Sequence, residues 1–233
     1  MKFQEPKVYL LDVEGTTSPL SLVYVQLFPY ARKHMEPYLR AHIHEQDLQA
    51  DLAPFRAALN SQATDQELLV SIASTHLIGL MDQDVKDPLL KKIQGRIWKS
   101  GFLSGELIGT VFADVAPAFE RWSQAARVAI YSSGSVEAQQ LLFGYSSAGD
   151  LRPAISGYFD TQSGPKTSPD SYSAIAGKLG VAPDEVLFIS DVVRELDPAR
   201  EVGCQTRLSL REGNLPISDS NGHVAIRSFE ELR

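Results

Sequence analysis

The chain has 233 residues, of which 43% are hydrophobic and 22% are charged, which is typical of a folded globular protein and excludes a disordered or fibrous one. Its net charge of −7, without any dense run of lysine and arginine, argues against a binder of nucleic acid or of anionic membranes. A single cysteine excludes an internal disulfide, and neither a signal peptide nor an apolar run of about 18 residues is found, so we expect a cytoplasmic monomer acting on a small molecule.

Short apolar runs that end in polar residues recur three times along the chain. They are residues 8–11 before Asp12, residues 128–131 before Ser132, and residues 186–189 before Ser190 and Asp191. Such runs are typical of buried strands, and helical patterns follow at residues 136–143 and at about 169–179. The alternation predicts an α/β protein with a doubly wound parallel sheet, a class in which ligands bind at the carboxyl ends of the strands.

The pattern between the first two of these runs is helical. Asp87 followed by Pro88 is typical of a helix start, and residues 64–67 fit a capping box. We therefore predict an α/β catalytic core of residues 1–19 and 114–233, into which residues 20–113 are inserted as a helical cap domain. Within the cap, Trp98 is expected in the core, whereas Lys99 is either solvated or a second cation near the substrate.

Two carboxylates, Asp12 and Glu14, lie two residues apart where the first strand is expected to end. One can attack a phosphate monoester while the other gives and takes the proton. Because the attacking group and the phosphate are both anionic, this reaction needs a cation such as Mg²⁺, for which Asp191 is a further ligand. The alternative is a solvated turn at Asp12 and a helix cap at Asp191.

Ser132, Ser133 and Lys166 can bind a phosphoryl group. Both serines precede a predicted helix, whose first amides favour an anion, and Lys166 supplies an ammonium ahead of another helix. Taken singly, the serines are better explained as a helix cap and the lysine as a surface residue. Together with the carboxylates, they provide a nucleophile, a proton donor, a metal site and an anion clamp, which favours phosphoryl transfer.

The order of these groups resembles the four signatures of the haloacid dehalogenase superfamily of phosphatases. In that superfamily the first Asp is phosphorylated, the residue two positions later is the acid/base, and a helical cap often follows the first strand. The acid/base is usually Asp, whereas this chain has Glu14. The sequence Asp-Val-Glu-Gly-Thr-Thr at 12–17 is instead similar to the enolase-phosphatases of methionine salvage, also called acireductone synthases. Further matching stretches are 27–31, 94–98, 105–107, 131–139, 157–161 and 190–192.

This resemblance implies a substrate, a metal and residue roles. The substrate would be 2,3-diketo-5-methylthiopentyl-1-phosphate, which is enolised and then dephosphorylated to the acireductone 1,2-dihydroxy-3-keto-5-methylthiopentene. Mg²⁺ would be bound by the side chains of Asp12 and Asp191 and by the backbone carbonyl of Glu14. The phosphate would be held by Ser132, Ser133 and Lys166, and the catalytic residues would be Asp12, Glu14 and Lys166. Glu195 is either a support for the metal's water ligands or an ordinary helix residue.

Two other functions agree with the same residues. A generic Mg²⁺-dependent phosphatase for another small phosphorylated metabolite would share the fold and the nucleophile but not the enolase step. A phospho-accepting signalling module also phosphorylates an Asp at a sheet edge, but such modules are shorter and lack a long helical insertion. Glu14, as an acid/base beside the phosphorylated residue, favours hydrolysis over a stable signalling phosphate.

Overall fold

The computed structural model describes residues 5–58, 66–85 and 87–232. The chain forms two compact units. Tyr24–Leu107 makes up one unit, and the chain before and after it, up to Val23 and from Ile108, makes up the other. The assignment of residues 1–19 and 114–233 to a catalytic core, and of 20–113 to a cap, stays a prediction. Within the described residues, no helix is long and apolar enough to cross a membrane.

The larger unit is built on a sheet of parallel strands. Across the sheet, the strands of the described residues are β3 (Ile155–Phe159), β2 (Arg127–Tyr131), β1 (Val8–Leu11), β4 (Val186–Ser190), β5 (Gln205–Ser209) and β6 (Ala225–Ile226). Leu11 pairs with Ile130 on one side and with Ile189 on the other, so the three predicted strands end at the same edge. The predicted α/β class with a parallel sheet is confirmed.

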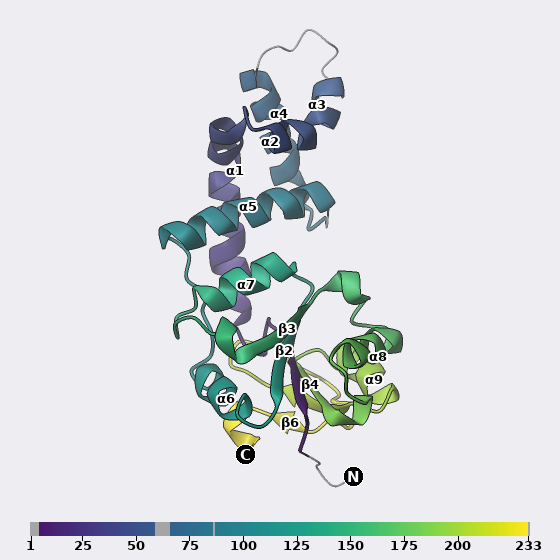
Figure 1. The fold of residues 1–233 in the computed structure, drawn as a ribbon. Coiled ribbons are helices and arrows are strands. Elements are labelled where there is room, and N and C mark those ends of the chain that lie inside the picture. Colours follow the sequence, from purple (N-terminus) through teal and green to yellow (C-terminus); the bar gives the residue numbers. More distant parts are fainter. Residues whose placement is uncertain (1–4, 59–65, 86, 233) are drawn as a thin grey trace. The chain divides into compact units, whose positions relative to one another are not determined.

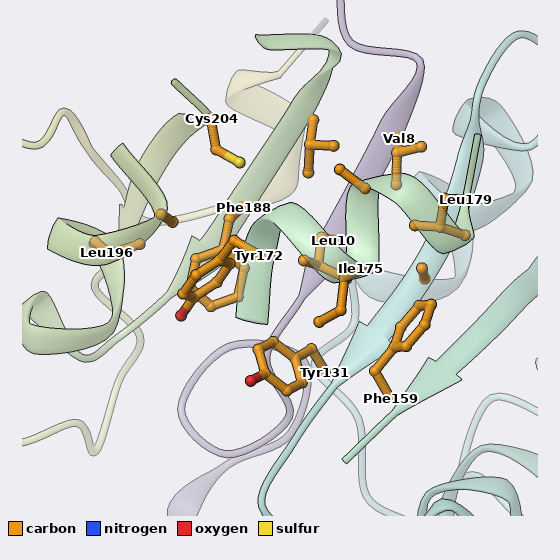
Figure 2. Close-up of a cluster of buried hydrophobic side chains, with 14 of the residues drawn as sticks. Val8, Leu10, Tyr131, Phe159, Tyr172, Ile175, Leu179, Phe188, Leu196 and Cys204 are labelled. Carbon is orange, nitrogen blue, oxygen red and sulfur yellow. The ribbon is translucent and has the colours of Figure 1, made fainter. Parts of the chain in front are cut away.

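Helices cover both faces of this sheet (Figure 1). One face is covered by α8 (Pro169–Lys178) and α9 (Val193–Glu201), and the other by α6 (Val115–Trp122) and α7 (Val136–Gly144). On the first face, Tyr172 of α8 packs its ring against Tyr131 and Phe188, with centroids 5.7 and 5.0 Å away (Figure 2). On the other face, Trp122 stacks on Tyr9 at 4.0 Å. Burial on both faces explains the continuous apolar runs of the central strands.

The described residues of the second unit form helices joined by turns, without a strand. Its helices are α1 (Phe28–His42), α2 (Gln46–Asp51), α3 (Ala53–Ala58), α4 (Gln66–Asp82) and α5 (Pro88–Ser104), and a π-helix, η1 (Leu22–Leu27), begins just before it. Asp87 caps α5 as predicted, its carboxylate accepting from Leu90 N at 2.9 Å. Trp98 packs against this unit's core and donates to Leu27 O at 2.8 Å. The capping box predicted at 64–67 begins outside the described residues.

Three strands of the sheet were not predicted from the sequence. In β3, exposed Ser156 and half-buried Gly157 interrupt the apolar pattern, and β5 carries Thr206 and Arg207. β6 is only two residues long. These strands lie toward the two margins of the sheet, where fewer side chains are buried, so their sequences lack the continuous apolar run of central strands.

A buried ion pair ties the end of the chain to the larger unit. The Arg211 guanidinium lies between the rings of Phe112 and Phe229, 4.8 and 4.4 Å from their centroids, and Nη1 is 2.7 Å from Asp114 Oδ2. Asp114 also accepts from Ser228 Oγ at 2.9 Å and from the Phe229 amide. Burial by itself would raise the pKa of Asp114, but the hydrogen bonds from Arg211 and from the Phe229 amide outweigh it and lower the pKa.

We expect Asp114→Asn to lower the free energy of unfolding by about 3–5 kcal/mol, because Arg211 would be left buried without its counter-charge. Urea denaturation measures the loss. Since the folded-state pKa of Asp114 is lowered, its stabilisation is complete above the pKa of an unfolded Asp and disappears as the pH falls through the folded value. Wild type and variant should therefore converge in acid. The control is Asp150→Asn, which breaks an exposed pair with Arg152 and should change nothing measurable.

Candidate active site

The ends of the central strands bring three polar side chains to one edge of the sheet. The Asp12 amide donates to Ile189 O at 3.0 Å, which places Asp12 next to the end of β4 and Ser190. The Ser132 amide donates to Phe159 O at 3.1 Å, so the chain after β2 keeps the strand pairing for one more residue. All three residues are almost fully buried. The parallel register thus creates a polar cluster at the carboxyl edge of the larger unit.

Lys166 reaches this cluster and pairs with two carboxylates. Its Nζ is 2.6 Å from Asp12 Oδ1 and 2.6 Å from Glu195 Oε2, and the lysine is only 8% exposed. Burial would lower the pKa of Lys166, but the charges of Asp12 and Glu195 raise it above its ordinary value, so the side chain stays an ammonium. The Tyr172 hydroxyl is 2.7 Å from Lys166 O and 2.8 Å from Glu195 O, which links the main chains of both partners.

Glu14 lies beside Ser132. Ser132 Oγ is 3.4 Å from Glu14 Oε2 and accepts a hydrogen bond from the Gly134 amide at 3.1 Å. Burial, followed by the charge of Asp12, raises the pKa of Glu14 above its usual range. A raised pKa makes the carboxyl hold its proton more readily than an ordinary Glu does, which suits a group that gives and takes a proton in turn. Ser133, by contrast, is exposed, so its side chain is not part of the buried cluster.

Asp191 approaches the turn after Glu14 because residue 15 is glycine. Gly15 has φ +69°, and a Cβ built on it would lie only 2.3 Å from Asp191 Oδ2. Burial, followed by the charges of Asp12 and Glu195, raises the pKa of Asp191 to about 7. Carboxylates crowded in this way repel one another, and a divalent cation bound between them would remove that repulsion.

The oxygen atoms at this edge fit a hard cation. Among the described residues, no three His, Cys, Asp or Glu side chains are arranged to hold a metal ion. A site made from Asp12, Asp191 and a backbone carbonyl needs only two such side chains. Mg²⁺ is usually held in this way, by one or two carboxylates together with water and substrate phosphate. The residues present therefore fit a divalent-cation site, while its ligand set and the choice of Mg²⁺ stay predictions.

Most of the residues predicted for the site lie together. Direct contacts join Asp12 to Lys166 and Glu14 to Ser132. Asp191 lies against the Gly15 turn, and the charge of Asp12 raises its pKa. Sequence reasoning assigned no role to Ser190, whose Oγ is 3.3 Å from Asp12 Oδ2 and 3.0 Å from Glu195 Oε2. Sequence reasoning also gave no role to Tyr172, whose position in the sequence is typical of an ordinary core aromatic residue. Only the three-dimensional structure reveals their contacts with the cluster.

Comparisons with known proteins agree with this chemistry. A family model described as haloacid dehalogenase-like hydrolase matches residues 6–203. The chain is 49% identical over 229 residues to enolase-phosphatase E1 of Synechococcus elongatus, with 96% of both chains covered. It is 45% identical over 224 residues to enolase-phosphatase E1 of Pseudomonas fluorescens, covering 96% of this chain and 95% of that one.

Solved structures support the same assignment. The UTR4 protein of Saccharomyces cerevisiae has a TM-score of 0.82 at 37% identity, covering 97% of this chain and all of the other. A dehalogenase with a TM-score of 0.59 at 21% identity shares the fold. The expected enzyme class, a phosphatase of a generally metal-dependent group acting on a small phosphorylated substrate, is confirmed. The chain belongs to the haloacid dehalogenase-like hydrolases and, within them, to the enolase-phosphatases of methionine salvage.

Proposed function

We propose that this enolase-phosphatase converts 2,3-diketo-5-methylthiopentyl-1-phosphate to the acireductone 1,2-dihydroxy-3-keto-5-methylthiopentene and phosphate, by way of an aspartyl-phosphate on Asp12. The observation that supports this most directly is the 2.6 Å contact between the buried Asp12 carboxylate and the Lys166 ammonium. It holds the candidate nucleophile at the sheet edge and places a positive charge beside it for the transferring phosphoryl group. The names of the relatives support the substrate.

In the phosphatase step, an Asp12 oxygen forms a bond to phosphorus while the ester bond to the substrate breaks. Glu14 gives a proton to the leaving oxygen and then takes one from the water that hydrolyses the aspartyl-phosphate, which regenerates Asp12. Lys166, Ser132 and the exposed Ser133 hold the phosphate oxygens.

Two further groups complete the proposal. Mg²⁺, held by Asp12, Asp191 and the Glu14 carbonyl, would offset the negative charge shared by nucleophile and phosphate. For the preceding enolisation, Glu14 is the candidate base because burial and Asp12 raise its pKa. The helical unit Tyr24–Leu107 is proposed as the cap that excludes water, and the enzyme as a cytoplasmic monomer.

The first test is turnover of the phosphorylated diketone with Mg²⁺, followed by ultraviolet absorbance for the enol and by a phosphate assay. We expect enol to precede phosphate, and Asp12→Asn to lower phosphate release by more than about a thousandfold, because the amide cannot form the phosphoenzyme. Asp150→Asn, at an exposed position, is the matched control. Phosphate release only from other monoesters would point to a generic phosphatase, and a stable phospho-Asp12 to a signalling module.

We expect Lys166→Met to lower kcat by about 100-fold and to weaken inhibition by inorganic phosphate, because the variant lacks the buried ammonium that faces Asp12. Steady-state kinetics with phosphate as a product inhibitor measures both effects. Lys178→Met removes an exposed lysine from α8 and serves as the control, with unchanged kinetics. Equal phosphate inhibition in wild type and Lys166→Met would contradict a phosphate-binding role for Lys166.

We expect Gly15→Ala to weaken Mg²⁺ binding by at least about tenfold, because the new methyl group would displace Asp191 from the turn. Calorimetric titration with Mg²⁺ measures the change. Gly180→Ala is the matched control, since Gly180 also has a left-handed φ of +65° but no atom beyond its chain neighbours lies within 4 Å of its Cβ position. Both variants carry backbone strain, so both should lose stability, whereas only Gly15→Ala should lose metal affinity.

A further inference from the structure

Three side chains, one at the end of β5 and two just after it, donate hydrogen bonds to two consecutive carbonyls of the turn after Asp12. Ser209 Oγ and Asn214 Nδ2 lie 3.0 and 2.9 Å from Gly15 O. Arg211 Nε lies 3.2 Å from Thr16 O. The donors and acceptors are nearly 200 residues apart in the sequence, and all belong to the larger unit.

The turn itself leaves these carbonyls without a main-chain partner. The amides of residues 16, 17 and 18 all point to Val13 O, at 3.2, 3.0 and 2.9 Å, and the Gly15 amide donates to Ser18 O at 2.8 Å. The carbonyls of Gly15 and Thr16 therefore depend on donors from elsewhere, because buried carbonyls in folded proteins are nearly always hydrogen-bonded. Among the described residues, Ser209, Arg211 and Asn214 supply those donors.

Asn214 also lies close to the candidate metal ligand Asp191. A Cβ on Gly15 would be 2.3 Å from Asp191 Oδ2 and 3.0 Å from Asn214 Oδ1, so both side chains press against the same glycine. Asn214 Nδ2 is in addition 3.2 Å from Ser209 O, which fixes the amide to the end of β5. The turn that follows Glu14 is thus held between Asp191 and the segment after β5.

This segment is itself anchored firmly. Arg211 lies between two aromatic rings and pairs with Asp114. The main-chain N–H of Asn214 donates to Arg211 O at 3.2 Å. Residues 209–214 also lie beyond residue 203, where the match to the haloacid dehalogenase-like family model ends. A rigid anchor outside the stretch that carries the shared signatures suits a positioning role better than a direct chemical one.

We propose that Ser209, Arg211 and Asn214 form a positioning clamp that fixes the turn containing the Glu14 carbonyl and Gly15, and so sets the spacing between that carbonyl and Asp191. The inference rests on the proposed metal-binding roles of Glu14 and Asp191. In this role the clamp residues act through the turn, by way of their hydrogen bonds to Gly15 O and Thr16 O. Their loss should therefore lower metal affinity and kcat, while leaving KM for the phosphorylated substrate nearly unchanged.

The test uses Asn214→Ala, Ser209→Ala and the double variant. We expect Asn214→Ala to weaken Mg²⁺ binding by ~10- to 100-fold in calorimetry and to lower kcat over a similar range, with KM changed by less than about twofold. Hydrogen–deuterium exchange of the peptide spanning residues 12–18 should become faster without metal present, because the turn has lost its donors. The double variant should lose more Mg²⁺ affinity and kcat than either single variant.

The matched control is Asn221→Gly. Asn221 belongs to the same C-terminal stretch and donates to Asp197 Oδ1 at 2.7 Å, and its φ of +48° suits glycine. This variant should leave Mg²⁺ affinity, kcat and exchange of residues 12–18 as in wild type. Ser209→Cys, which keeps a weak donor of similar size, should recover part of the loss seen in Ser209→Ala.

The outcomes separate the clamp from the proposed function. If Asp12→Asn abolishes turnover while the Asn214 and double variants keep wild-type Mg²⁺ affinity and exchange, the clamp is overturned and the function stands. If these variants lose thermal stability but keep the Mg²⁺ affinity and the exchange of residues 12–18 seen in Asn221→Gly, their role is merely structural and the clamp is likewise overturned. If Asp12→Asn stays active, the function fails, and the exchange rates of residues 12–18 still decide whether the clamp orders the turn.

Discussion

The balance of buried charge at the carboxyl edge of the sheet is the constraint on which the larger unit depends. Asp12 and Glu195 are held against one ammonium, that of Lys166, at 2.6 Å from each. Removing a charged group from water is costly unless its partner is close, so the three groups are stable only as a set. Burial also raises the pKa of Glu14 and of Asp191. The edge therefore holds more carboxylate than the lysine can neutralise, which is the condition that a divalent cation would satisfy.

The aromatic core behind this edge explains how a charged cluster is held still. Lys166 Nζ lies 5.7 and 5.9 Å from the ring centroids of Tyr131 and Phe188. Tyr131 is the last residue of β2, and Phe188 lies within β4. Tyr172 packs on the same rings and directs its hydroxyl to the main chains of Lys166 and Glu195. Apolar packing thus fixes the distances on which the electrostatics depend, since a core packed to crystal density leaves little room for displacement.

Much of this arrangement could be predicted because it follows from strand ends. The apolar runs before Asp12, Ser132 and Asp191 indicated three parallel strands, and residues far apart in sequence must then meet at one edge. What could not be predicted depends on contacts that leave no local pattern. The margin strand β5 has too few apolar residues to be recognised, and Asn214 is an ordinary polar loop residue until Gly15, 199 positions earlier, is placed against it. The roles of the site residues remain predictions.

Glycine 15 shows why the local and the long-range constraints cannot be separated. Its left-handed backbone lets the chain turn sharply after Glu14. Its missing Cβ leaves room for Asp191, which follows β4, and for Asn214, which lies in the segment after β5. A residue of any other type would strain the turn and push both neighbours away. The order of Asp12, Glu14 and Gly15 is therefore given by the first strand and the loop after it. The exact position of that loop depends on hydrogen bonds from residues in the last fifth of the chain. In this chain, residues from the first and the last fifth of the sequence together place one turn.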